Sequence, residues 1–132
     1  MSTVISSAIP TFDLTIKRGD GEQYTITIGP PSGPTVDLRT GCTVWYTAKK
    51  KTSDADDVAV IQKTSAPGGG IEILPDSPGN KIVLSLVAAD TEDLGENVRL
   101  YHDIQTQFVG QEPHTAMDGR LTVLPDATRS TL

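Results

Sequence analysis

The chain has 132 residues but only one cysteine, Cys42, and no long hydrophobic run. A single cysteine excludes an internal disulfide, so side-chain packing and backbone hydrogen bonds must stabilise the fold. No apolar stretch approaches the ~18 residues of a transmembrane helix, and residues 1–10 lack the basic start and apolar block of a signal peptide. We therefore expect a protein that folds in the cytoplasm, with Cys42 as a small buried hydrophobe rather than a nucleophile.

Basic residues are also scarce, with 11 Lys and Arg against 17 Asp and Glu, which gives a net charge of −6. Non-specific binding to nucleic acid or to anionic lipid requires basic patches, so neither nucleic acid nor a membrane is an expected partner. The longest basic run, residues 49–51, is followed by Asp54, Asp56 and Asp57. A calcium loop beginning at Asp54 would need a glycine at its sixth position and a glutamate at its twelfth, and the sequence has neither. We interpret this stretch as a solvated loop.

The residues that are present favour β-strands, most clearly between residues 98 and 123. From Leu100 to Phe108 every second residue belongs to a mostly apolar set, and polar residues stand between them. A period of two is typical of a strand with one face on a core and the other in water. The same phase returns after a turn at residues 110–113, which predicts a long antiparallel hairpin. Because two strands are at best marginally stable in water, the remaining strands must cover this hairpin.

Six further strands are predicted by short apolar alternations bounded by glycine and proline. They cover residues 12–17, 24–28, 43–49, 58–62, 71–73 and 82–86. Residues 87–95 are acidic near their start and end in a glycine, which predicts one or two helical turns. Eight short strands without a long helix indicate one antiparallel β-sandwich over residues 12–125, with a small closed barrel as the alternative. Residues 1–11 are predicted to form an N-terminal arm and residues 126–132 a C-terminal tail.

The sequence contains no recognisable catalytic, cofactor-binding or metal-binding motif, so we expect a non-enzymatic protein without a cofactor. His102 and His114 are the only histidines, and neither belongs to a cluster with metal-ligand spacing. His102 shares the core-facing phase of the hairpin, and we expect it to be half-buried with its hydrogen bonds satisfied. Arg18-Gly19-Asp20 spells a tripeptide that integrins can bind on a loop tip, but between two strands we interpret it as a turn.

Trp45 is the candidate ligand platform in this sequence. Trp45 and Tyr46 lie next to each other on one predicted strand, and either ring can stack against a sugar or a base. A sandwich core normally takes such residues, so we expect Trp45 in the core. The exposure of Trp45 distinguishes a core residue from a ligand platform, because a buried ring cannot bind a sugar and an open ring beside polar side chains can.

Five pieces of the chain occur in the order found in structural domains of tailed bacteriophages. They are residues 13–20 (DLTIKRGD), 36–44 (VDLRTGCTV), 82–84 with 89–94 (IVL and ADTEDL), 101–105 (YHDIQ) and 118–129 (DGRLTVLPDATR). With these pieces the chain resembles the immunoglobulin-like N-terminal domain of phage baseplate upper proteins and similar small virion proteins. The resemblance covers about Phe12 to Arg129. It implies an immunoglobulin-like sandwich of about seven to nine strands with one short helical turn near residues 88–94.

The resemblance also implies a non-enzymatic structural component of a tailed-phage particle, present in several symmetric copies that contact other virion proteins. Two departures from the pattern matter. Similar domains often carry an aromatic residue at the position of His102, and baseplate domains are commonly followed by a fibre or receptor-binding region, whereas this sequence stops at Leu132. The second departure favours a tail, neck or baseplate adaptor or a decoration protein over a receptor-binding protein.

The N-terminal arm is the predicted docking segment for such an assembly. Val4, Ile5 and Ile9 are apolar residues in a polar stretch, and in an arm they bury their side chains only against a partner. The alternative from another class is a carbohydrate- or host-receptor-binding module, or a capsid decoration protein, with Trp45 or the loop at residues 110–113 as the contact region.

Overall fold

The computed structural model describes residues 11–29, 37–51, 59–76, 79–92, 94 and 98–125. These residues form eight strands and one short helix: β1 Leu14–Lys17, β2 Glu22–Thr27, β3 Cys42–Lys49, β4 Ile61–Thr64, β5 Ile71–Ile73, β6 Lys81–Leu86, α1 Ala88–Thr91, β7 Val98–Phe108 and β8 His114–Leu124. The predicted docking residues Val4, Ile5 and Ile9 lie outside the described residues, as do the acidic loop after residue 51 and the tail.

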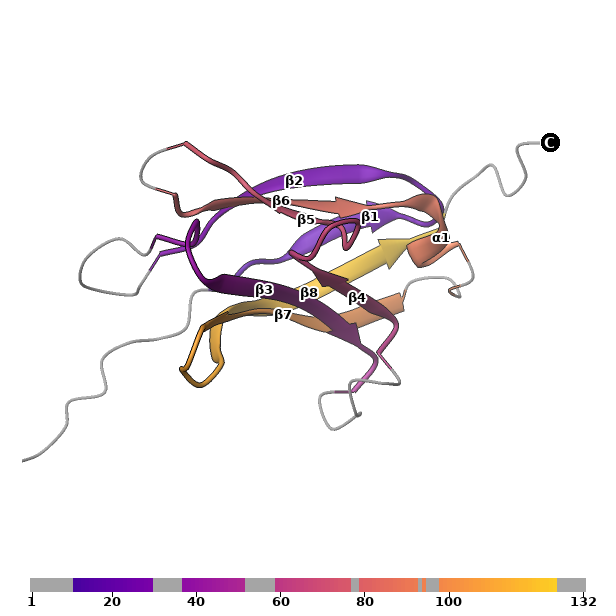
Figure 1. The fold of residues 1–132 in the computed structure, drawn as a ribbon. Helices are drawn as coiled ribbons and strands as arrows, with labels where there is room; N and C mark the ends of the chain where they lie inside the picture. The colour runs from indigo at the N-terminus through magenta and orange to yellow at the C-terminus, as the bar shows by residue number, and fades with distance from the viewer. Residues whose placement is uncertain are drawn as a thin grey trace, which may run out of the picture.

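The strands form two separate sheets that pack face to face (Figure 1), so the chain is an all-β sandwich rather than a closed barrel. The larger sheet has the order β1-β8-β7-β3-β4, and the smaller has the order β2-β6-β5. All pairs of strands are antiparallel except β1 and β8, which run parallel. The first and last strands of the domain therefore lie side by side at one edge of the larger sheet.

The predicted hairpin is confirmed as β7 and β8. The register aligns Leu100 with Leu121 and shifts between Ile104 and Gln105, which marks a β-bulge. At the tip, the Gln111 amide donates to the Phe108 carbonyl over 3.0 Å, and Gly110 has a φ of 78° that an L side chain rarely adopts. Glycine at this position lets two long strands reverse direction.

The core lies between the two sheets and follows the predicted alternation. In β3 the buried residues are Val44, Tyr46 and Ala48. The hairpin adds Leu100, His102, Ile104, Leu121 and Val123, and β6 adds Ile82, Leu84 and Leu86. Burying an aliphatic or aromatic side chain contributes about 1.5–3 kcal/mol relative to leaving it in water. The buried hydrophobic residues of these strands belong to one continuous core cluster between the sheets.

The helix α1 is a single turn that connects β6 to β7 at one end of the sandwich. Its Asp90 carboxylate accepts a hydrogen bond from the Val87 amide over 2.8 Å and pairs with Lys63 of β4 over 2.9 Å. The turn between β1 and β2 packs on the same end: the Gly19 amide donates to the Thr91 hydroxyl, and the Arg18 guanidinium donates to the Leu94 carbonyl, each over 2.8 Å. Only 4% of Arg18 is exposed, so the tripeptide at residues 18–20 is a structural turn, as expected.

None of the described helical residues forms a segment of the length and hydrophobicity that would cross a membrane.

Candidate ligand-binding face of the larger sheet

His102 is buried and both of its ring nitrogens are hydrogen-bonded. Nε2 lies 2.8 Å from the Phe12 carbonyl, and Nδ1 lies 2.8 Å from the Tyr46 hydroxyl. A carbonyl can only accept, so Nε2 carries the proton and Nδ1 accepts from Tyr46. The imidazole also stacks on the Phe12 ring with centroids 4.1 Å apart. The expectation of a satisfied histidine is confirmed, although only 3% of the residue is exposed and it is buried rather than half-buried.

Burial lowers the pKa of His102, because desolvation disfavours the imidazolium. The hydrogen bond to Phe12 and the nearby carboxylates of Asp13 and Asp118 raise it, but by less. Burial likewise raises the pKa of the Tyr46 hydroxyl far above its ordinary value. Both groups are therefore neutral at physiological pH, and the pair is a structural element that attaches β1 to the hairpin.

Gly119 of β8 makes room for this attachment, a role that sequence reasoning missed. Gly119 lies directly across from His102, and a Cβ built on it would collide with the Phe12 carbonyl, the same oxygen that accepts from His102. Any side chain at Gly119 would therefore displace the chain before β1. Nothing in the sequence marks this glycine, because the contact joins residues more than a hundred positions apart.

Trp45 is not in the core, which corrects the expectation from its sequence. Val44, Tyr46 and Ala48 fill the inner face of β3, so the alternation of the strand places Trp45 on the outer face of the larger sheet. There it is partly exposed and lies directly across from Gln105 of β7 and Thr64 of β4. The partly exposed ring beside polar side chains lies between the buried and the open ring that we distinguished above.

The register of β3, β7 and β8 arranges the outer face in three rows that cross the strands. The cationic row contains Lys49, Tyr101 and Arg120; the carboxylate row contains Thr47, Asp103 and Asp118; the tryptophan row contains Trp45, Gln105 and Thr115. Residues directly opposite each other on neighbouring strands share a face and approach closely. The sequence shows the polar side of each strand, but it does not reveal which residues become neighbours.

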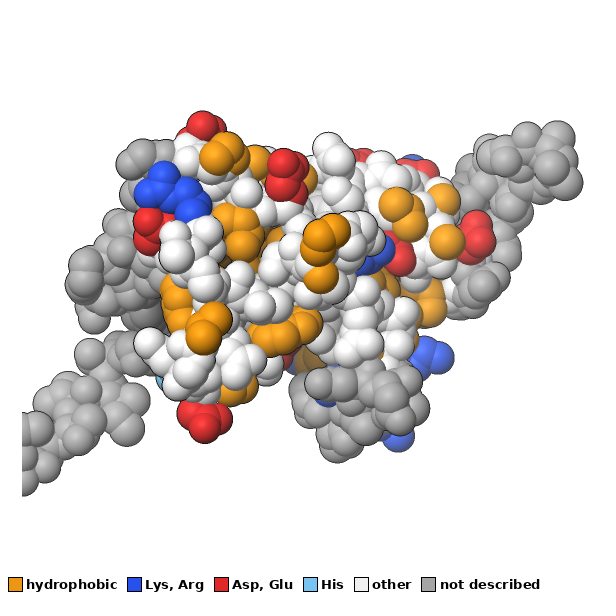
Figure 2. Space-filling model, viewed as in Figure 1, with side chains coloured by type: hydrophobic (Ala, Val, Ile, Leu, Met, Phe, Trp, Pro, Cys, Tyr) orange, Lys and Arg blue, Asp and Glu red, His pale blue; other side chains and the backbone are white. Residues whose placement is uncertain are grey.

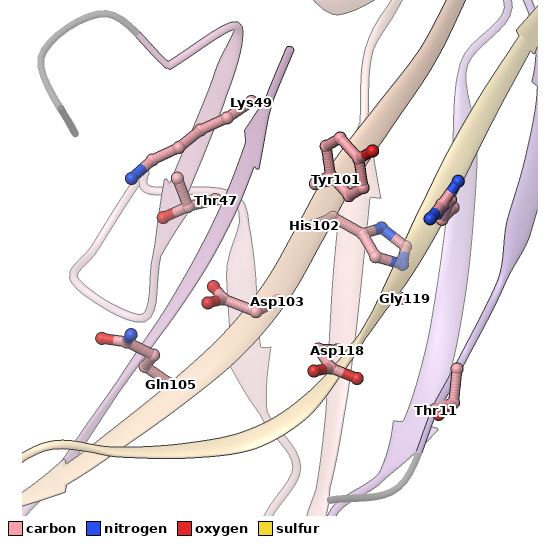
Figure 3. A pocket seen from close by; sticks show the side chains of 10 residues that line it. Thr11, Thr47, Lys49, Tyr101, His102, Asp103, Gln105, Asp118 and Gly119 are labelled. Atoms are coloured by element: carbon pink, nitrogen blue, oxygen red, sulfur yellow. The ribbon is translucent and has the colours of Figure 1, made fainter. Parts of the chain in front are cut away.

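A hollow of about 390 Å³ lies on this face, and we call it the trough. Its lining comes from the cationic row, the carboxylate row, Gln105, Thr11, His102 and Gly119 (Figure 3). The carboxylate row has shorter side chains than the lysine, tyrosine and arginine on one side and the glutamine at position 105 on the other. These shorter residues between longer ones hollow a sheet face that would otherwise be flat.

The charges of the trough balance, unlike those of the whole chain. Two cations, Lys49 and Arg120, and two carboxylates, Asp103 and Asp118, sum to zero, whereas the chain has a net charge of −6. The Arg120 guanidinium lies 4.7 Å from the centre of the Tyr101 ring, a cation–π contact that holds both side chains along one side of the trough. This trough therefore offers donors and acceptors without a strong field of either sign.

The other regions considered from the sequence lie elsewhere. The tip of the hairpin, residues 110–113, is outside the trough, and its neighbour Val109 is 85% exposed. Cys42 is partly buried against the core, and this burial raises the pKa of its thiol, which is consistent with packing rather than nucleophilic chemistry. The described residues contain no group of three or more His, Cys, Asp or Glu side chains that could hold a metal ion.

The outer face of the smaller sheet carries a second, more open hollow of about 500 Å³ beneath the glycine-rich turn at residues 65–70. Its lining is mostly small side chains with one carboxylate, Glu72, and contains no aromatic residue. The two hollows therefore differ in chemistry, because an aromatic ring and charges of both signs line only the hollow on the larger sheet.

A scan against protein-family models and a search of curated proteins found no match to this chain. The fold and the polar outer face define an all-β sandwich with a candidate ligand-binding trough.

Proposed function

We propose that the chain is a non-enzymatic structural component of a tailed-phage particle, an immunoglobulin-like sandwich in the tail, neck or baseplate. The order of the strands supports the immunoglobulin-like class. The smaller sheet has the B-E-D order of that fold when β2, β6 and β5 take those positions, and β8-β7-β3-β4 has its G-F-C-C′ order. The topology is compatible with this class, and the five sequence pieces described above are what point to a virion protein among β-sandwiches.

Assembly in several copies requires a surface that a second molecule can extend, and β2 provides the longest such edge. The sheets end in β1, β4, β2 and β5, of which β2 has six residues and the others four or fewer. Among the described segments, β2 pairs only with β6, so its other side offers backbone donors and acceptors for an added strand. This edge is the observation on which the assembly proposal rests.

The face shown in Figure 2 carries charged side chains of both signs, and hydrophobic side chains are scattered between polar ones. The arms of neighbouring copies, with Val4, Ile5 and Ile9, are the proposed partners of the edge.

Light scattering of the full chain at several concentrations tests the assembly. We expect a discrete ring or trimer that dissociates when residues 1–10 are removed, with the circular dichroism of the sandwich unchanged. A chain that stays monomeric at every concentration would contradict self-assembly and leave attachment to a different virion protein as the form to test.

The location is tested on tailed particles produced by the phage or bacterium that encodes the chain. We expect peptide mass spectrometry to find the chain in purified particles, and gold-labelled antibodies to mark one axial position in electron micrographs. Particles that lack the chain altogether would refute the proposal.

Saccharide binding is the second candidate function, because Trp45 lies on an outer face beside polar side chains rather than in the core. The trough gives this candidate a specific site.

A further inference from the structure

We propose that the trough binds a neutral saccharide chain that lies across β3, β7 and β8. This inference deepens the second candidate function and does not depend on the assembly proposal. It is carried by the shape of the trough, by its hydrogen-bonding groups, by its charge balance and by the position of Trp45.

The shape fits an extended ligand. The rows run across the strands, and adjacent strands are about 4.8 Å apart, so a row of three residues spans about 10 Å between its outer strands. The carboxylate row forms the floor, the longer side chains of the cationic row line one side, and Gln105 lines the other. A chain of two or three sugar rings matches this length. A flat sheet face would not fix the position of such a ligand.

The hydrogen-bonding groups fit sugar hydroxyls. Each hydroxyl both donates and accepts, and the trough offers both partners: carboxylates on the floor accept, the cations along one side donate, and Gln105 and Thr47 do either. A carboxylate has about four acceptor positions, so the exposed Asp118 can accept from more than one hydroxyl of a ligand. A ligand with only donors or only acceptors would satisfy half of these groups.

The charge balance selects a neutral ligand over charged ones. An acidic sugar would place its carboxylate near Asp103 and Asp118, and a basic peptide would place its ammonium groups near Lys49 and Arg120. Either ligand gains one attraction and suffers one repulsion of similar size. A neutral saccharide avoids both and loses nothing to long-range repulsion by the acidic protein.

Trp45 supplies the apolar surface that sugar recognition needs. The C–H face of a sugar ring packs on an aromatic ring while its hydroxyls reach polar neighbours. Trp45 lies directly across from Gln105, which lines the trough, so a bound ring can contact both residues. Tyr101 is 38% exposed and Arg120 lies over its ring, so Trp45 adds an aromatic surface on this face that no such cation contact occupies among the described residues.

The test uses the full chain and its single tryptophan, which lies beside the trough, directly across from its lining residue Gln105. Short linear oligomers of glucose, mannose, galactose and N-acetylglucosamine are titrated while the emission of Trp45 is recorded. We expect a saturable change with at least one of them and a Kd on the order of 1 mM or tighter, as for a small ligand with few contacts.

Asp118→Asn is the discriminating variant. Its side chain is exposed and its size is kept, but one acceptor oxygen on the floor becomes a donor. We expect binding to weaken by about tenfold or more while circular dichroism and thermal unfolding stay unchanged. Glu72→Gln is the matched control, because it makes the same chemical change at an exposed carboxylate on the opposite sheet, and it should leave the Kd unchanged.

Three results would overturn the proposal. The first is no change in Trp45 emission with any of the four oligomers, and the second is equal affinity for wild type and Asp118→Asn. The third is tighter binding of an oligouronate or an oligolysine peptide than of any neutral sugar. None of these outcomes alters the light-scattering result, so the failure of saccharide binding and the failure of assembly are distinguishable.

Discussion

His102 connects the start of the sandwich to its longest hairpin, and its protonation state decides whether the Tyr46 hydroxyl can donate to it. Its neutral form donates to the Phe12 carbonyl and accepts from the Tyr46 hydroxyl. The imidazolium form has no acceptor at Nδ1, so protonation breaks the hydrogen bond donated by Tyr46. Tyr46 is fully buried and would have to rotate its hydroxyl or lose its partner.

Stability should therefore fall as the pH drops below about 6.5. The pKa of His102 is lowered in the folded chain, so below its ordinary value of 6.5 the unfolded state binds a proton that the folded state does not. The stabilisation by neutral His102 is fully present above about pH 6.5 and is lost as the pH falls toward the pKa of His102 in the folded chain. Urea unfolding at about pH 7.5 and about pH 5.5 measures the drop.

A pair of variants assigns this pH dependence to one histidine. His102→Gln keeps one donor and one acceptor but does not titrate, so it should reduce the difference in unfolding free energy between the two pH values. His114→Gln is the control, because His114 is exposed on β8 and makes no comparable buried contact. An unchanged pH dependence in His102→Gln would show that other groups cause it.

Gly119→Ala should destabilise the fold by about 1–3 kcal/mol, as overpacking usually does. The added methyl group collides with the Phe12 carbonyl, so the chain must move and the hydrogen bond to His102 must lengthen. Gly29→Ala is the matched control, because Gly29 has open space around its Cβ position and should change stability by no more than about 0.5 kcal/mol. Chemical unfolding of the three proteins gives both values.

At the scale of the element, α1 is too short to be stable by itself and depends on Asp90. A four-residue helix has one turn, and nucleating a single turn is unfavourable without external contacts. Asp90 supplies two of them, to the Val87 amide and to Lys63 of β4. The Asp90 and Lys63 side chains are only 16% and 14% exposed, so this ion pair is better shielded from water than a surface pair.

Asp90→Ala should lower the free energy of unfolding by about 1–3 kcal/mol, because it removes an acceptor and leaves the Lys63 ammonium without its carboxylate. Asp90→Asn keeps an acceptor for the Val87 amide, so it should lower the free energy of unfolding by less than Asp90→Ala does. Glu92→Ala, at an exposed position just after α1, is the control and should change little. If Asp90→Ala and Glu92→Ala have equal effects, the two contacts of Asp90 contribute nothing measurable.

Most elements were predictable because strands leave a local signal. All eight predicted strands and the helical turn exist, with ends that differ by a few residues, since alternation shows phase better than boundaries. The expectation that Trp45 lies in the core was wrong, although the sequence contained the information to avoid it. Val44, Tyr46 and Ala48 are alternate residues of one strand and form its apolar face, so Trp45 must lie on the other face. Two adjacent aromatic residues cannot both face one core from a single strand.

At the scale of the whole molecule, the features that the sequence could not predict are those set by register. The trough joins Thr47, Asp103 and Asp118 from three strands, and the contact between Phe12 and Gly119 joins the two ends of the domain. Their sequence separation gives no local pattern, and a shift of one residue would turn each side chain to the other face. The polar alternation of Asp103, Gln105 and Gln107 predicted only that one face of β7 would be polar.

The edge of β2 is the surface whose alteration should affect assembly without affecting the fold. Thr25 and Thr27 are exposed on this strand, and lysines on an edge strand disfavour the addition of a further strand. The double variant Thr25→Lys with Thr27→Lys should therefore shift the full chain from its assembled form to the monomer in light scattering. Its unfolding free energy should change by no more than about 0.5 kcal/mol, because neither side chain contributes to the core.

Thr15→Lys is the control, because it places a lysine at an exposed position of a different edge strand, β1, which lies at the opposite edge of the larger sheet from β4. If β2 receives the added strand, this variant should assemble like the wild type. If Thr15→Lys dissociates the assembly and the double variant does not, the contact lies along the edge of β1, where the N-terminal arm enters the sandwich. Strand addition at β2 would then be wrong, while assembly through the arm would still stand.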